Sequence, residues 1–364
     1  MGRTRELMQH LDVVDRLLPL LLQGFKTSTI RWQEAPISLG ALEYRCESNP
    51  KVKVRVWVVK VTHMPLSAAA AYLGRAAEWS PDIMLIGMRA HYPSIELSDM
   101  VQVIEHLTPE ESKPKLMSSM KILLIHGLIG SLNDPRIVDA FGDVEVLAPD
   151  LLGYGEFASF PTENLTLQDQ ADHLANWLRG SSSESVHVVG HSVGGAVGLL
   201  LAYTYPALVA SYVSVEGNMT LKDAFWSAEL SRKPDSEVAS IVESYRQDVR
   251  SWIGAAGVEP TALALEIAGA WINHQPPSTI KAQAKAVVEA TRNDEYLNKL
   301  RVLIQRGHWV HLVAGEKSRS DWDIPAWVEQ ASTSMTTIEN RGHLMMLESP
   351  EEFADTIVRV LSPV

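Results

Sequence analysis

The most constraining feature of this sequence is the pentapeptide Gly190-His191-Ser192-Val193-Gly194. The apolar run VHVV precedes it, and the helix-forming stretch GAVGLLLAYTYP overlaps its end and continues from it. Glycines two residues before and two after a serine permit the strained turn that lifts a nucleophilic side chain above the end of a strand. A helix N-terminus behind Ser192 also favours negative charge at that point. The alternative is a glycine-rich turn with a capping serine, and further features have to decide between the two.

The surrounding residues alternate between strands and helices. Apolar, β-branched runs occupy 121–127, 144–149, 186–192, 209–217 and 309–315, and helical patterns separate them. Strands that are apolar on both faces and alternate with helices are typical of a parallel sheet covered on both sides. Residues 121–364 are therefore predicted to form an α/β domain with a doubly wound, mostly parallel sheet. Residues 218–305 contain no convincing strand and are predicted to be a helical insertion.

Three further features lie at the ends of the predicted strands. His126-Gly127 ends the first strand, and the backbone N–H groups of Leu128 and Val193 are candidates for an oxyanion hole. Such donors contribute about 2.7–4 kcal/mol each in comparable sites. The loop PDLLGYG at 149–155 follows the second strand, and Arg341-Gly342-His343-Leu344 precedes a final helix. His343 is the general base that Ser192 would need.

With HG, DxxGxG, GHSVG and GH in this order, residues 121–364 resemble the α/β hydrolases. The resemblance implies hydrolysis of an ester, thioester or related acyl substrate, or of an activated carbon–carbon bond, through a seryl acyl-enzyme. It implies no cofactor, and it makes the insertion at 218–305 a helical cap. Ser rather than Asp at position 192 argues against the dehalogenase and epoxide-hydrolase branches. The strands that usually precede the HG strand are missing, so we expect a shortened sheet or one completed by the N-terminal domain.

Two places in the sequence are candidates for the acid that pairs with His343. The usual position in the family holds Ser318 here, whereas Glu216 ends the preceding strand, which is the other position that the family uses. An ionised Glu at the end of an apolar strand is costly unless it is paired. We therefore predict a catalytic set of Ser192, His343 and Glu216, with Asp321 and Asp323 as the alternative acids.

The N-terminal part has a different pattern. Apolar residues at helical spacing predict a helix over 5–23, and Gly24 is well placed to end it. VKVRVWVVKV at 52–61 alternates and predicts a half-buried strand of a small antiparallel sheet or barrel. Residues 109–120 are polar and contain Pro114, which predicts a linker after a domain at 1–108.

The stretch GFKTSTIRW at 24–32 resembles the ASCH domain, a small α+β β-barrel related to the PUA RNA-binding fold. The resemblance implies a pocket with Lys26, Thr29 and Arg31 that binds RNA or a nucleoside. Some relatives hydrolyse N4-acetylcytidine, with Lys26, Thr29 and Glu78 as the matching residues here. The simpler alternative is a threonine-rich strand without a ligand. Gly40 is followed by Ala where the family has Asp.

Composition limits the function classes. The formal net charge of −12 is carried by residues 119–364, whereas residues 1–118 are close to neutral, so the acidic part disfavours long contacts with polyanions. A single cysteine, Cys46, excludes a disulfide framework and indicates a reducing, cytoplasmic location. No apolar run approaches the roughly 20 residues of a membrane span, and no zinc-type spacing occurs. The rival interpretation is an RNA- or nucleotide-binding protein whose hydrolase half is an inactive scaffold.

Overall fold

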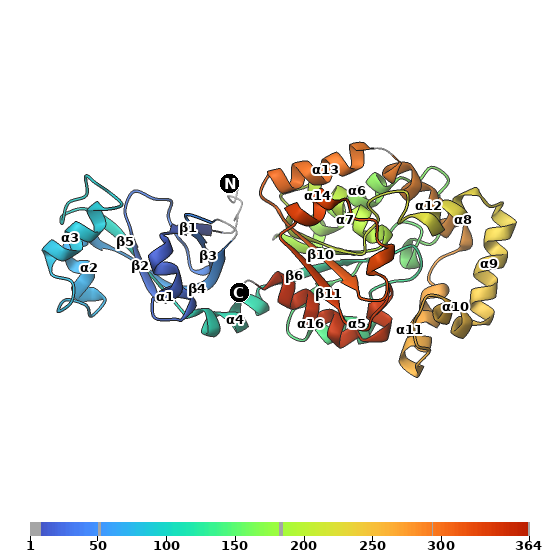
Figure 1. Ribbon diagram of the computed structural model, residues 1–364, viewed down its shortest axis with the longest axis horizontal. Coiled ribbons are helices and arrows are strands. Elements are labelled where there is room, and N and C mark those ends of the chain that lie inside the picture. The colour runs from blue at the N-terminus through green and yellow to red at the C-terminus, as the bar shows by residue number, and fades with distance from the viewer. Residues whose placement is uncertain (1–8, 50–51, 182–184, 293, 363–364) are drawn as a thin grey trace. The chain divides into compact units, whose positions relative to one another are not determined.

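The computed structural model describes residues 9–49, 52–181, 185–292 and 294–362. Contacts divide the chain into two compact units, the first running to Ser118 and the second spanning Ser119–Leu361 (Figure 1). The first unit contains one sheet and the second unit another, and no strand pairing joins the two sheets among the described residues. The sheet of the second unit has six strands of its own.

The N-terminal unit is built on a five-stranded sheet with the order β1-β3-β4-β5-β2. Strand β4 carries the predicted alternation, with Val54, Val56 and Val58 fully buried, and it pairs antiparallel with both neighbours. Strands β1 and β2 are the outer strands, and Arg31 Nη2 donates to Asp12 O across them at 2.8 Å. Among the described residues, the strand order is that of an open sheet, because no strand pairing between β1 and β2 closes it into a barrel. The elements are β1 (Gln9–Val13), α1 (Leu18–Leu22), β2 (Ser28–Arg31), β3 (Gly40–Cys46), β4 (Lys53–Pro65), α2 (Leu66–Tyr72), α3 (Pro81–Arg89), β5 (Met100–His106) and α4 (Pro109–Ser118), with a 3-10 turn at Asp15–Leu17.

Two predictions for this unit were wrong. The helix predicted over 5–23 is confined to α1 and the preceding 3-10 turn, while Gln9–Val13 form a strand that pairs parallel with β3. Residues 5–8 lie outside the described residues. The predicted linker contains helix α4, and the Ser112 hydroxyl there accepts a hydrogen bond from Trp57 N of β4 at 2.8 Å. This helix is therefore part of the N-terminal unit.

The second unit has a six-stranded, parallel sheet with the order β11-β10-β9-β8-β6-β7. Helices α5 and α16 lie on one face, and α6, α7 and α13 lie on the other (Figure 1). All five predicted strands are present, and β11 is an additional one. The strands are β6 (Lys121–Ile125), β7 (Glu145–Leu147), β8 (Val186–His191), β9 (Val209–Val215), β10 (Trp309–Gly315) and β11 (Ser334–Ile338). The helices outside the insertion are α5 (Pro135–Val138), α6 (Leu167–Ser181), α7 (Val193–Thr204), α14 (Ala326–Ala331), α15 (Met345–Glu348) and α16 (Pro350–Leu361), with 3-10 turns at Asp139–Phe141, Gly155–Phe157 and Arg319–Asp321.

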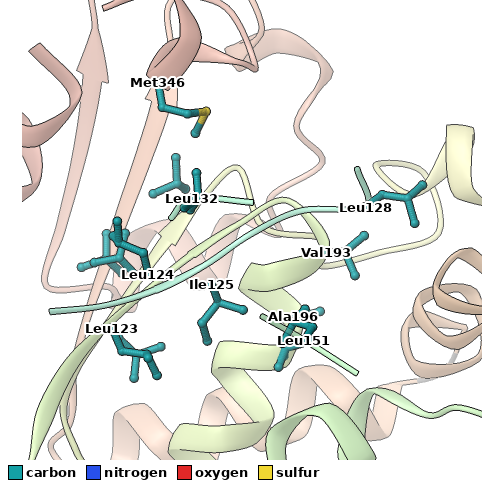
Figure 2. Packing of buried hydrophobic residues seen from close by; sticks show 14 of the residues in the cluster. Leu123, Leu124, Ile125, Leu128, Leu132, Leu151, Val193, Ala196 and Met346 are labelled. Atoms are coloured by element: carbon teal, nitrogen blue, oxygen red, sulfur yellow. The ribbon is translucent and has the colours of Figure 1, made fainter. Parts of the chain in front are cut away.

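The core of this unit surrounds β6 and α7. Leu123, Leu124 and Ile125 are at most 1% exposed, as expected for a central strand covered on both faces (Figure 2). Helix α7 is buried along most of its length because it lies between the sheet and the helices α6 and α13. This packing fixes the carboxyl end of β8 and the start of α7, where Ser192 lies.

The insertion between β9 and β10 is helical, as predicted. Its helices are α8 (Phe225–Arg232), α9 (Asp235–Gln247), α10 (Val249–Ala255), α11 (Ala262–Ile272), α12 (Pro277–Thr291) and α13 (Asp294–Gln305). The first five pack mainly on one another, whereas α13 packs against α7 and belongs to the layer that covers the sheet. The cap therefore consists of α8–α12. No helix in the described part of the chain is long and apolar enough to cross a membrane.

Candidate active site

Ser192 lies in a strained turn between β8 and α7. Its backbone has φ 54° and ψ −122°, a conformation that non-glycine residues rarely adopt. The flanking glycines are required by close backbone approach, because a Cβ on Gly190 would lie 2.3 Å from Gly194 O, and one on Gly194 would lie 2.3 Å from Ile125 O. The turn is held by Ser192 N–H, which donates to Val215 O at 3.0 Å. The local geometry is that of a nucleophile elbow.

Glu216 and His343 form a hydrogen-bonded pair. Glu216 directly follows β9 and is 4% exposed, and its Oε2 lies 2.6 Å from His343 Nδ1. Its Oε1 accepts from Gly315 N at 2.8 Å and from the Ser318 hydroxyl at 2.6 Å. Burial raises the pKa of the Glu216 carboxyl, but the hydrogen bond and charge of His343, together with Ser318 and Gly315, outweigh it and hold this pKa below its ordinary value. Glu216 is therefore an ionised carboxylate that accepts a hydrogen bond from the N–H at His343 Nδ1.

His343 is held at the same edge of the sheet as Ser192 through His191. His191 Nε2 lies 2.9 Å from His343 O, and the two rings are 4.7 Å apart between centroids. Burial lowers the pKa of His191 well below its ordinary value, so its ring is neutral and donates from Nε2. The His343 side chain is 40% exposed. Sequence reasoning missed this positioning role of His191, although its place beside Ser192 was the available signal.

The backbone N–H groups of Leu128 and Val193, the predicted donors to an oxyanion, have no protein acceptor in the described part of the chain. The segment that carries Leu128 passes close to the serine, because a Cβ on Gly127 would lie 3.2 Å from Ser192 Cβ. Leu128 and Val193 are buried and belong to the hydrophobic core of this unit (Figure 2).

The alternative acids do not reach His343. Asp323 accepts from the Thr220 hydroxyl at 2.6 Å and pairs with Lys222 at 3.5 Å. Asp321 is exposed at the end of a 3-10 turn. No hydrogen bond or ion pair joins either Asp to His343 within the described ranges.

The residues predicted to form the N-terminal pocket are only partly brought together. Lys26 Nζ donates to Ser28 O at 2.5 Å, and burial with the nearby charge of Arg31 lowers the pKa of Lys26 to about 8. Thr29 is buried on β2. Glu78 is 60% exposed and pairs with Arg75 at 2.8 Å, and no hydrogen bond or ion pair joins it to Lys26 or Thr29 within the described residues.

Sequence reasoning missed two buried groups near Lys26 and Arg31. Tyr44 OH and His106 Nε2 have no hydrogen-bond partner among the described residues, and the same holds for Arg31 Nε. The Tyr44 and His106 rings are 5.4 Å apart between centroids. Burial lowers the pKa of His106 to about 4, so the ring is neutral. These three polar atoms lie close to the two cations, since the charge of Arg31 acts on Tyr44 and that of Lys26 acts on His106.

The profile of the alpha/beta hydrolase family matches residues 122–356. Sequence relatives include lipase 1 of Psychrobacter immobilis, 24% identical over 64% of this chain and 74% of that protein. A putative carbamate hydrolase RutD of Pantoea ananatis is 34% identical over 26% of this chain and 36% of that protein. Lipase 3 of Moraxella sp. is 33% identical over 29% of this chain and 33% of that protein. The matched stretch thus spans only about a third of the length of the first relatives.

Solved structures have the same fold. An esterase from Thermogutta terrifontis aligns with a TM-score of 0.53 and 19% identity, over 67% of this chain and 89% of that one. The epoxide hydrolase CorEH aligns with a TM-score of 0.55 and 18% identity, over 67% and 92% of the two chains. Fold and site together define the class: this chain belongs to the alpha/beta hydrolase family. The family match begins at residue 122 and gives no support to the ASCH resemblance of the N-terminal residues.

Proposed function

We propose that this protein is a serine hydrolase that cleaves an ester, thioester or related acyl substrate through an acyl-enzyme on Ser192. The observation that carries the proposal is the 2.6 Å pair of His343 Nδ1 and Glu216 Oε2, beside a serine in a nucleophile elbow. The sequence relatives named as lipases are consistent with this class of substrate.

In the proposed reaction, His343 removes the Ser192 hydroxyl proton as the oxygen attacks the acyl carbon. The N–H groups of Leu128 and Val193 stabilise the oxyanion that forms. The imidazolium, stabilised by Glu216, then protonates the leaving group, and a water molecule activated by His343 releases the acid from the serine. The hydrogen bonds from Gly315 and Ser318 favour the ionised form of Glu216, so its negative charge faces the imidazolium during both steps of the reaction.

Labelling with a fluorophosphonate tests this proposal. The phosphorus is attacked by an activated serine, so we expect covalent modification of the native protein at the peptide that contains Ser192, detected by mass spectrometry. A His343→Ala variant should label far more slowly because the general base is lost. A folded native sample that stays unlabelled would instead favour the rival interpretation, an inactive hydrolase scaffold.

We further propose that the N-terminal unit binds RNA or a nucleoside, with Lys26, Thr29 and Arg31 at the site, as the ASCH resemblance implies. The supporting observation is that two cations lie close together, since the charge of Arg31 lowers the pKa of Lys26, and that polar groups of Tyr44 and His106 are buried beside them. The pairing of Glu78 with Arg75 at the surface disfavours the alternative in which this unit hydrolyses acetylcytidine with Glu78 as the acid. Binding without hydrolysis is therefore the form of the proposal that the geometry favours.

Titration of the full chain with a short RNA, cytidine and N4-acetylcytidine tests this binding. The pKa of Lys26, about 8, predicts that RNA affinity is highest below pH 8 and falls as the pH rises through that value, because the cation loses its proton. Lys26→Met should weaken RNA binding and remove most of this pH dependence. The control is Lys113→Met, whose side chain is 58% exposed on α4. Absence of binding to all three compounds would leave this unit without the proposed role.

A further inference from the structure

The segment that follows β6, residues 127–132, is called here the oxyanion loop because it carries the N–H of Leu128. Three consecutive peptide groups of this loop are each held by a different side chain. His126 Nδ1 lies 2.9 Å from Gly127 O, and Tyr154 OH donates to Leu128 O at 2.9 Å. Gly130 N–H donates to Gln275 Oε1 at 3.0 Å. The peptide group that carries the Leu128 N–H is therefore held through Gly127 O, and the two peptide groups that follow it are held through Leu128 O and Gly130 N–H.

The first two contacts come from the α/β core, whereas the third comes from the cap. Gln275 lies in the turn between α11 and α12, and it is 2% exposed. Its Nε2 donates to Trp271 O at 3.2 Å, so both ends of the side-chain amide are engaged. The Trp271 ring also packs on the loop, because a Cβ on Gly130 would lie 2.4 Å from it.

The turn that carries Gln275 is itself anchored to the core. His274 Nε2 pairs with Asp150 Oδ1 at 2.6 Å, and His274 O accepts from Gly155 N at 2.9 Å. Asp150 and Gly155 belong to the loop after β7, and the same loop supplies Tyr154. The cap turn, the loop after β7 and the oxyanion loop thus form one connected set of hydrogen bonds.

We propose that Gln275 is a positioning residue of the cap that aligns the Leu128 N–H with the oxyanion. Alignment of this donor then requires the α11–α12 turn to be seated on the core. The inference rests on the proposed serine-hydrolase function and adds to it a residue that no sequence motif indicates. Displacement of an oxyanion donor by about 1 Å lowers the reaction rate on the order of 10²-fold. Because this donor acts on the charge that develops during the reaction, its displacement should lower kcat and leave substrate binding nearly unchanged.

The experiment compares Gln275→Ala with Gln283→Ala in the full chain. Gln283 is the matched control, since it is a fully buried glutamine of the cap that bonds Gln170 at 3.1 Å and has no contact with the oxyanion loop among the described residues. For p-nitrophenyl acetate, Gln275→Ala should lower kcat about 10- to 100-fold with KM nearly unchanged. Gln283→Ala should lower Tm without this loss in kcat. Gln275→Glu keeps an acceptor for Gly130 N–H and should recover part of the loss.

A second readout reports the oxyanion directly. Ser192 Oγ adds to the carbonyl carbon of an aliphatic trifluoromethyl ketone, His343 takes the hydroxyl proton, and the resulting hemiketal places its oxyanion in the hole. Gln275→Ala should raise the Ki of this ketone at least 10-fold more than it raises KM. The inference is overturned if Gln275→Ala and Gln283→Ala change kcat, KM and Ki alike while the native protein is active. Failure of the native protein to react with fluorophosphonate overturns the proposed function and this inference with it.

Discussion

Ser192→Ala is expected to lower kcat for short p-nitrophenyl esters by about 10⁶-fold, the loss found when the nucleophile of a comparable triad is removed. The reason is that no other hydroxyl occupies the elbow between β8 and α7. The measurement is the steady-state rate of p-nitrophenol release.

The fold of this variant should be intact. Alanine retains the Cβ of serine, and the turn is held by the backbone bond from residue 192 N–H to Val215 O, which the substitution leaves in place. Thermal unfolding should therefore shift by only a few degrees. Substantial residual esterase activity in a folded Ser192→Ala protein would mean that the nucleophile lies elsewhere.

Glu216→Gln is expected to lower kcat by about 10⁴-fold, as neutralisation of a triad acid does. A neutral amide cannot stabilise the imidazolium of His343, and its NH₂ group can bond Nδ1 as a donor, which selects the wrong tautomer. Asp321→Asn and Asp323→Asn should each change kcat less than about 3-fold, since neither carboxylate contacts His343 in the described structure. The measurement is kcat for all three variants under the same conditions.

The Asp variants are the matched controls because each removes one negative charge from a segment that follows β10, whose carboxyl end lies at the same edge of the sheet as that of β9, which Glu216 follows. The assignment of Glu216 as the acid is wrong if Asp323→Asn lowers kcat strongly while Glu216→Gln remains active. Ser318→Ala provides a milder test, because it removes one of the two further hydrogen bonds to Glu216 and leaves the His343 pair in place.

Sequence patterns predicted the strands of the second unit well and the start of the chain poorly. The strands β6, β8, β9 and β10 are apolar on both faces, so any compact structure has to bury them in the middle of a sheet. The helix expected over 5–23 failed because apolar residues such as Leu11 and Val13 suit a helix face or a strand equally well. These residues form a strand and not a helix because they pair with β3, with Leu11 opposite Tyr44.

The sequence by itself determined the elbow at Ser192, because its requirements are local. Only glycine fits where a Cβ would meet backbone oxygen at 2.3 Å, and the strand, turn and helix are contiguous in the chain. The sequence also limited the candidates for the acid that pairs with His343 to a few carboxylates. Only the tertiary structure decided that Glu216 meets His343, 127 residues further along the chain, and that Ser318 donates a hydrogen bond to it. The contact between Gln275 and Gly130, 145 residues apart, is of the same kind. Hydrogen bonds act over about 3 Å, and distances of that size between remote segments are set by the packing of the sheet and the cap.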